Sequence, residues 1–264
     1  MYSFTTMATP GYTTEEAIRL ASRYGYDGID LRVSDYKGEL NETSTKNEIS
    51  HVRKVLDSEG IQSSGLFCYN KSGDESKESW IVMRESILRL IDIAEQLNSP
   101  SIRISAGYPG KFPDRDEYIK HNAEVLGSIL KNHSSNIDLL IQNHTGGYLT
   151  EDAVKLINMV DSARIGLAFS PDHCVIEKED MEKAYKTVRD VTKQIYIADI
   201  ELKSQEYIPL LPGKGCVPIK DALMALGGKS FKGWITFKWE KIWHEELQGP
   251  EIALPYFIEY MKGM

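Results

Sequence analysis

Residues 137–169 read IDLLIQNHTGGYLTEDAVKLINMVDSARIGLAF and contain one unit of a pattern that repeats along the chain. An apolar run at 137–143 is followed by Thr150-Glu151-Asp152, which resembles a helix N-terminal cap, and then by apolar residues at helical spacing. A second apolar run follows at 164–169. Short apolar runs of this kind are typical of strands buried on both faces of a parallel sheet. The unit therefore predicts a strand, a helix and a parallel strand.

The same alternation of short strand and amphipathic helix occurs eight times in the 264 residues. Predicted strands lie near residues 2–6, 28–33, 61–67, 100–105, 137–143, 164–169, 193–199 and 233–239. Eight such units match the size and rhythm of a (β/α)8 TIM barrel. A doubly wound open sheet usually has fewer strands and often a glycine-rich first turn. The sequence predicts an α/β protein with one barrel domain over residues 1–264, and the irregular stretches at about 34–44 and 200–217 are expected to be loops of its active face.

Composition narrows the classes of partner. A net charge of −8 argues against nucleic acid or an anionic membrane, because a phosphate-binding surface needs clustered Lys and Arg. No apolar run approaches the roughly 18 to 20 residues that cross a bilayer, and residues 1–10 lack the features of a signal peptide. The three cysteines are widely spaced, so neither a disulfide framework nor a structural zinc site is expected. A cytoplasmic protein is predicted.

In such a barrel the reacting groups lie at the C-terminal ends of the strands. The residues that the pattern places there are Arg32, Cys68, Asn70, Arg103, Gln142, His144, Ser170, Asp172, His173, Tyr196, Asp199, Lys238 and Glu240.

Several segments carry a family resemblance. Gly25-Tyr26-Asp27-Gly28-Ile29-Asp30-Leu31-Arg32 opens it, and Tyr207-Ile208-Pro209-Leu210, Gly213-Lys214-Gly215 and Gly233-Trp234-Ile235-Thr236-Phe237 continue it toward Trp239-Glu240-Lys241. From residue 25 to its end the chain resembles the sugar phosphate isomerase/epimerase family, with its xylose-isomerase-like barrel. The resemblance implies a small-molecule sugar or sugar-acid ligand and is compatible with a homodimer.

The resemblance also implies a divalent metal held by two Glu, one Asp and one His from strands five to eight. Aligned by motif, these four positions carry Gln142, Ser170, Tyr196 and Lys238. Three carboxylates around a dication leave a formal charge of about −1, whereas this set supplies about +1 without any metal. We therefore expect no metal and no other cofactor. A displaced metal site at His144, Asp172 and Glu240, two residues further along each strand, remains an alternative.

Lys238 has three competing interpretations. It could replace the metal as a structural cation, clamp a ligand, or act as an amine of low pKa that serves as a base or forms an imine. The predicted catalytic residues are Lys238, His144, His173 and Glu240, and the predicted substrate-binding residues are Arg103, Gln142, Ser170, Asp172, Tyr196 and Asp199.

The predicted function is that of a sugar (phosphate) isomerase or epimerase relative that binds a small polyhydroxylated ligand without the usual divalent metal. Two alternatives stay open. One is a catalytically inactive paralogue that binds a sugar or a partner, and the other is a lyase or aldolase-like enzyme that uses a Lys238 imine.

Overall fold

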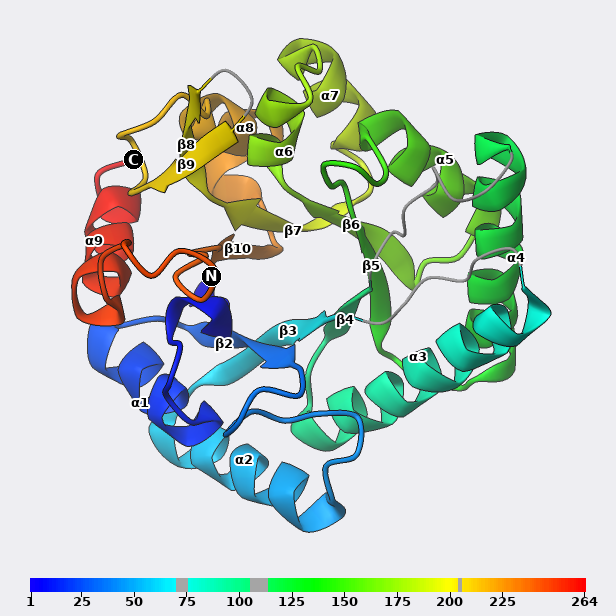
Figure 1. The fold of residues 1–264 in the computed structure, drawn as a ribbon, viewed down its shortest axis with the longest axis horizontal. Coiled ribbons are helices and arrows are strands. Elements are labelled where there is room, and N and C mark those ends of the chain that lie inside the picture. The colour runs from blue at the N-terminus through cyan, green and yellow to red at the C-terminus, as the bar shows by residue number, and fades with distance from the viewer. Residues whose placement is uncertain (70–75, 105–113, 204–205) are drawn as a thin grey trace.

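The computed structural model describes residues 1–69, 76–104, 114–203 and 206–264, so Asn70 lies outside the described residues. In this part of the chain, eight parallel strands form one sheet in the order β1-β10-β7-β6-β5-β4-β3-β2. A parallel bridge between Thr5 and Asp30 joins the two edge strands and brings the ring nearly to closure (Figure 1). The strands are β1 Tyr2–Phe4, β2 Gly28–Val33, β3 Gln62–Cys68, β4 Ser101–Ile104, β5 Asp138–Gln142, β6 Ile165–Phe169, β7 Thr192–Ile197 and β10 Trp234–Phe237.

Helices surround the strands as an outer ring, as a TIM barrel requires. The helices are α1 Thr14–Tyr24, α2 Lys46–Glu59, α3 Lys77–Leu97, α4 Arg115–Asn132, α5 Thr150–Val160, α6 Pro171–Ile176, α7 Met181–Val188, α8 Ile219–Ala225 and α9 Pro250–Lys262, with the 3-10 helices η1 Thr6–Ala8 and η3 Gly228–Ser230. The predicted (β/α)8 barrel is confirmed.

Helix α5 begins where the sequence pattern placed it. Its N-cap is Leu149, whose backbone N–H donates to Asp152 Oδ2 at 3.3 Å. The Thr150 hydroxyl instead donates to Glu179 Oε2, which ties the helix start to the segment ahead of α7. The cap therefore uses Asp152 but not the threonine hydroxyl.

The stretch at 200–217, expected to be a loop, contains an antiparallel hairpin of β8 Asp199–Lys203 and β9 Glu206–Leu210. Predicted strand seven accordingly ends at Ile197 instead of running to residue 199. The expectation of an irregular loop was wrong because apolar residues alternate on both arms, Ile200 with Leu202 and Ile208 with Leu210, which is the period of a strand. The hairpin extends the barrel rim beyond β7 (Figure 1).

The interior of the barrel is partly polar. An apolar cluster of Met7, Phe67, Leu140, Ala168 and Tyr196 fills part of it. Beside this cluster Asp30 is fully buried, and its Oδ2 accepts hydrogen bonds from the Tyr196 hydroxyl at 2.7 Å and from Gln194 Nε2 at 2.9 Å. Burial raises the pKa of Asp30 to about 6, although these two hydrogen bonds and the Arg103 charge oppose the rise.

Across the described ranges of the chain, no helix combines the length and the apolar character that crossing a bilayer requires.

Candidate functional site

Three strand ends bring together the polar groups at the C-terminal face. Lys238 directly follows β10, and Gln142 is the last residue of β5. Strand β6 passes through Ser170 into α6, where Pro171 at the first helical position fixes the direction of the turn. Asp172 and His173 therefore lie in the first turn of α6, and both are buried beside Lys238.

The Lys238 ammonium is at the centre of a group of polar side chains, which we call the Lys238 cluster and which contains Lys238, Asp172, His173 and Glu240. Its Nζ donates to Asp172 Oδ2 at 2.7 Å and to His173 Nε2 at 3.1 Å, and it lies 3.6 Å from Glu240 Oε1. The side chain is 2% exposed. Burial lowers the pKa of Lys238, but the Asp172 and Glu240 carboxylates outweigh burial, so that the pKa lies above its usual value. Lys238 is therefore a cation at neutral pH.

Two neutral imidazoles flank this cation. The rings of His144 and His173 have centroids 4.1 Å apart. Burial, reinforced by the Lys238 charge, lowers the pKa of His144 to about 4 and that of His173 well below its usual value. Because an ammonium only donates, the contact with Lys238 uses a lone pair on His173 Nε2. On the other side of the ring, the Thr145 backbone N–H donates to His173 Nδ1 at 3.4 Å, and the Thr145 hydroxyl lies 3.3 Å from the same nitrogen.

The tautomer of His144 follows from a single contact. Its Nδ1 lies 2.8 Å from the Thr145 carbonyl oxygen, which can only accept. His144 Nδ1 therefore carries the proton, and Nε2 carries a lone pair. His144 is partly exposed, unlike His173.

A second polar chain runs alongside the cluster. Arg103 Nε donates to Gln142 Oε1 at 2.7 Å, and Gln142 Nε2 donates to Ser170 Oγ at 2.6 Å. The guanidinium also donates to the Cys68 carbonyl oxygen at 2.7 Å and lies 4.3 Å from the centre of the Phe67 ring. These contacts fix Arg103 and Gln142 in place and hold a positive charge near the Lys238 cluster.

Tyr196 and Asp199 stand apart from this arrangement. The Tyr196 hydroxyl donates to Asp30 inside the barrel, and the residue is fully buried. The Asp199 carboxylate accepts hydrogen bonds from four backbone N–H groups, of Gly213, Gly215, Ile200 and Val217, at 2.8 to 3.0 Å. Asp199 therefore organises the loop after the hairpin, and a ligand role for it or for Tyr196 stays a prediction.

The donors at the four positions where the family resemblance implies a metal do not fit a divalent ion. Gln142 is bonded to Arg103 and Ser170, Tyr196 is bonded to Asp30, and Lys238 is positively charged. Divalent ions favour carboxylate or imidazole ligands over such groups.

The displaced alternative has a similar obstacle, because Asp172 and Glu240 both face the Lys238 ammonium. Within the ranges that the structure describes, no three His, Cys, Asp and Glu side chains are grouped as a metal site needs.

One acceptor in the cluster is unused. Asp172 Oδ1 is buried and has no hydrogen-bond partner among the described residues. A buried carboxylate oxygen without a partner is unfavourable, so the atom has capacity for a donor such as a ligand hydroxyl.

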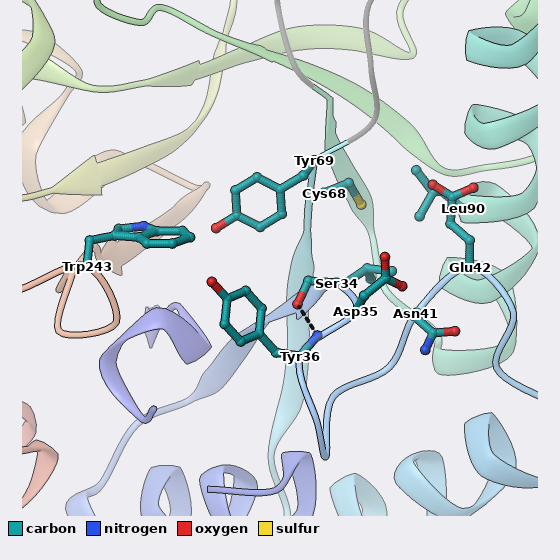
Figure 2. A pocket seen from close by; sticks show the side chains of 10 residues that line it. Ser34, Asp35, Tyr36, Asn41, Glu42, Cys68, Tyr69, Leu90 and Trp243 are labelled. Carbon is teal, nitrogen blue, oxygen red and sulfur yellow. Dashed lines mark hydrogen bonds between the residues drawn. The ribbon is translucent and has the colours of Figure 1, made fainter. Parts of the chain in front are cut away.

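A cavity of about 490 Å³ lies on another side of the barrel mouth, at the ends of β2 and β3 (Figure 2). The described residues that line it include none of the Lys238 cluster and are Val33, Ser34, Asp35, Tyr36, Asn41, Glu42, Cys68, Tyr69, Leu90 and Trp243. The sequence patterns singled out only Cys68 by residue, although the stretch 34–44, expected to be an active-face loop, contributes Ser34, Asp35, Tyr36, Asn41 and Glu42. The signal for Trp243 was an aromatic residue in the polar segment 240–246 directly after the last strand.

Comparison with known proteins places this geometry in context. A family model described as a xylose isomerase-like TIM barrel matches residues 18–254. An inosose dehydratase of Clostridium perfringens strain 13 is 21% identical over 260 residues, covering 88% of this chain and 84% of the relative. An inosose dehydratase of Lacticaseibacillus casei is 20% identical over 267 residues, covering 89% of each.

Solved structures share the fold at lower identity. The IolI protein, solved with a bound zinc atom, superposes with a TM-score of 0.82 at 15% identity, covering 98% of this chain and 95% of that one. A D-psicose 3-epimerase of Clostridium cellulolyticum H10, solved with D-tagatose, gives a TM-score of 0.80 at 13% identity, covering 99% and 98%.

Proposed function

The chain belongs to the xylose isomerase-like TIM barrel family, and from this premise we propose that it binds a small polyhydroxylated carbonyl compound at the C-terminal face and moves a proton at the carbon beside the carbonyl group. The names of its relatives, inosose dehydratase and D-psicose 3-epimerase, support this class of ligand. The observation that carries the proposal is the Lys238 ammonium, held between Asp172 and His173 at the ends of barrel strands.

The chemistry assigned to Lys238 is electrostatic. Removal of a proton from the carbon beside a carbonyl places negative charge on the carbonyl oxygen, and a fixed cation in a site of low dielectric stabilises that charge. Lys238 is held by Asp172 at 2.7 Å and needs no reorientation during the reaction. In this proposal, Lys238 does without a metal what a divalent ion would do at the usual family site.

Two groups are placed to exchange the proton. His144 Nε2 carries a lone pair, and Glu240 has a carboxyl group on a side chain that is 16% exposed. The base takes the proton from carbon and the bonding electrons move to the carbonyl oxygen. Return of a proton to the opposite face of that carbon gives an epimer. An isomer forms when the hydroxyl proton on that carbon passes to the former carbonyl oxygen and the carbon-bound proton returns to the former carbonyl carbon.

Deuterium exchange tests this step directly. A panel of aldoses, ketoses and inososes is incubated in D₂O with the protein, and deuterium at the carbon next to the carbonyl is read by mass spectrometry. We expect incorporation with at least one compound, and a loss of at least a hundredfold in rate for Lys238→Met, because one preorganised charge contributes about that much. Lys229→Met makes the same change at an exposed lysine and serves as the control.

A protein that binds a panel member and exchanges none would be a binding protein without turnover. This outcome would remove the catalytic half of the proposal.

Metal independence has its own measurement. Protein purified without chelators is expected to contain substoichiometric Mn, Zn, Mg and Co, and exchange is expected to persist in EDTA, because in this proposal the Lys238 ammonium, paired with Asp172 and Glu240, replaces the ion. One tightly bound ion per chain, lost together with activity on chelation, would contradict this part of the proposal.

A further inference from the structure

The cavity at the ends of β2 and β3 has an aromatic wall. Tyr36, Tyr69 and Trp243 come from three separate segments and gather on one side of it (Figure 2). They are 48%, 42% and 52% exposed, and the rings of Tyr36 and Trp243 meet edge to face at 6.1 Å between centroids. Exposed aromatic rings that converge on one cavity mark a ligand-binding surface, whereas scattered ones need no explanation.

The opposite wall is polar and acidic. It carries Asp35, Asn41 and Glu42 (Figure 2), and among the described residues that line the cavity there is no Lys, Arg or His. Arg32 lies behind the Tyr36 ring at 4.4 Å, but its side chain is 1% exposed and paired with Glu39 at 2.5 Å. The Glu39 carboxylate therefore balances the charge of Arg32 beside the cavity.

The aromatic side and the acidic side of the cavity together favour one class of ligand. Aromatic rings pack against the C–H faces of a ring, and carboxylate and amide oxygens accept hydrogen bonds from its hydroxyl groups. A phosphate or carboxylate group would instead face the carboxylates of Asp35 and Glu42, and no described residue of the lining supplies a cation to balance it.

We propose that this cavity binds an uncharged, unphosphorylated sugar or cyclic polyol ring, with Tyr36 and Trp243 against its C–H face and Asp35 and Glu42 accepting from its hydroxyls. The inference rests on the proposed function and deepens it, because it adds a second binding site for the same class of compound and names the residues that would form it. The cavity lies apart from the Lys238 cluster, so the two sites can be tested separately.

The test uses Trp243 as a reporter. Of the four tryptophans, all of which the structure describes, Trp80, Trp234 and Trp239 are 7%, 7% and 1% exposed, and Trp243 is 52% exposed. Acrylamide quenching of tryptophan fluorescence therefore reports mainly on Trp243. The probes are myo-inositol, D-glucose and D-fructose, each beside a phosphate monoester of the same compound. At least one neutral probe is expected to protect Trp243 from acrylamide quenching in a saturable way. Its phosphate ester is expected to bind about tenfold more weakly or worse.

Variants locate the binding. By calorimetry, Trp243→Ala is expected to lower the affinity for the neutral probe by about tenfold, which is the loss expected when one ring contact is removed. Trp243→Phe is expected to lower it by about threefold or less. Tyr36→Ala is expected to weaken it similarly, whereas Tyr12→Ala makes the same change at a tyrosine that is 36% exposed outside the cavity and is expected to leave affinity unchanged. Asp35→Asn with Glu42→Gln is expected to narrow the preference for the neutral probe over its ester by roughly threefold to tenfold.

Several outcomes would overturn the inference: no probe shields Trp243, the esters bind as tightly as the neutral probes, or Trp243→Ala binds as well as the parent. The deuterium exchange described above separates this failure from failure of the proposed function. Exchange that depends on Lys238 with no shielding of Trp243 removes this inference alone. Shielding without exchange keeps the aromatic site and removes the proton-transfer step.

Discussion

Lys238 illustrates how one charge inside a barrel is kept stable. Its 2.7 Å ion pair with Asp172 is almost fully buried, with side chains 2% and 4% exposed. Removing one partner of a buried pair leaves an uncompensated charge and typically destabilises by about 3 to 5 kcal/mol, whereas neutralising both does not. We expect Lys238→Met to lose about that much in urea unfolding at pH 7, and Lys238→Met with Asp172→Asn to recover most of it. Equal losses in the single and double variants would contradict the pair.

The same residue gives a prediction about imine chemistry. A lysine that forms an imine must be deprotonated, but the carboxylates of Asp172 and Glu240 raise the pKa of Lys238. Borohydride treatment in the presence of keto sugars is therefore expected to give no adduct at Lys238, read by intact mass and peptide mapping. An adduct that maps to Lys238 would restore the lyase or aldolase alternative.

At the scale of single residues, the sequence predicted where a residue lies in the barrel better than it predicted which groups its side chain contacts. Lys238, Asp172 and His173 could be placed on one face because parallel strands of a barrel end on the same side. The direction of the Tyr196 hydroxyl could not, since it depends on Asp30, which lies 166 residues away in the chain and inside the barrel. The pairing of Asp199 with the N–H groups of its own loop required knowledge of the hairpin.

At the scale of elements, the loop after the β8–β9 hairpin is held by close packing around Gly215. A Cβ at this position would lie 2.3 Å from Asp199 Oδ1 and 2.3 Å from the Ile200 carbonyl oxygen. We expect Gly215→Ala to lower the free energy of unfolding by about 1 to 3 kcal/mol, as overpacking does.

The matched control for that substitution is Gly127→Ala within α4, where a Cβ meets nothing within 4 Å. The control is expected to raise stability by about 0.5 to 1 kcal/mol, because alanine favours a helix over glycine. Urea denaturation of both variants checks the pair, and a Gly215→Ala protein as stable as the parent would show that Asp199 is not tightly seated.

At the scale of the whole molecule, buried groups set opposing dependences of stability on pH. His144 has a pKa of about 4 in the folded protein against 6.5 ordinarily, so the unfolded chain binds more protons between these values and stability rises with pH. The buried His173 acts in the same direction. Asp30, with a pKa of about 6 against 3.8, does the reverse, and stability falls as pH rises through that window.

Replacing Asp30 by Asn should therefore steepen the rise of stability between about pH 4.5 and 6, by up to about 1.4 kcal/mol per pH unit, since one opposing proton is removed. Urea unfolding across this range measures the slope. Asp116→Asn, at a side chain that is 73% exposed, is the control and should run parallel to the parent. A parallel profile for Asp30→Asn would show that its carboxyl group titrates normally.

The barrel as a whole was the most predictable property, because eight repeats of one pattern restrict the fold far more than any single strand does. The hairpin and the aromatic cavity were not predicted. Tyr36, Tyr69 and Trp243 are far apart in the chain, and only the closed ring brings them to one cavity.

Closure of the ring has a consequence for biosynthesis. Strand β10 lies between β1 and β7, yet it spans Trp234–Phe237 and follows the other seven barrel strands in chain order. While the ribosome is still elongating the nascent polypeptide, β1 and β7 each present an unpaired edge that invites association with other chains. Arrest of translation shortly before residue 234 should accordingly yield a species that chaperones retain, and emergence of β10 from the ribosome should free it.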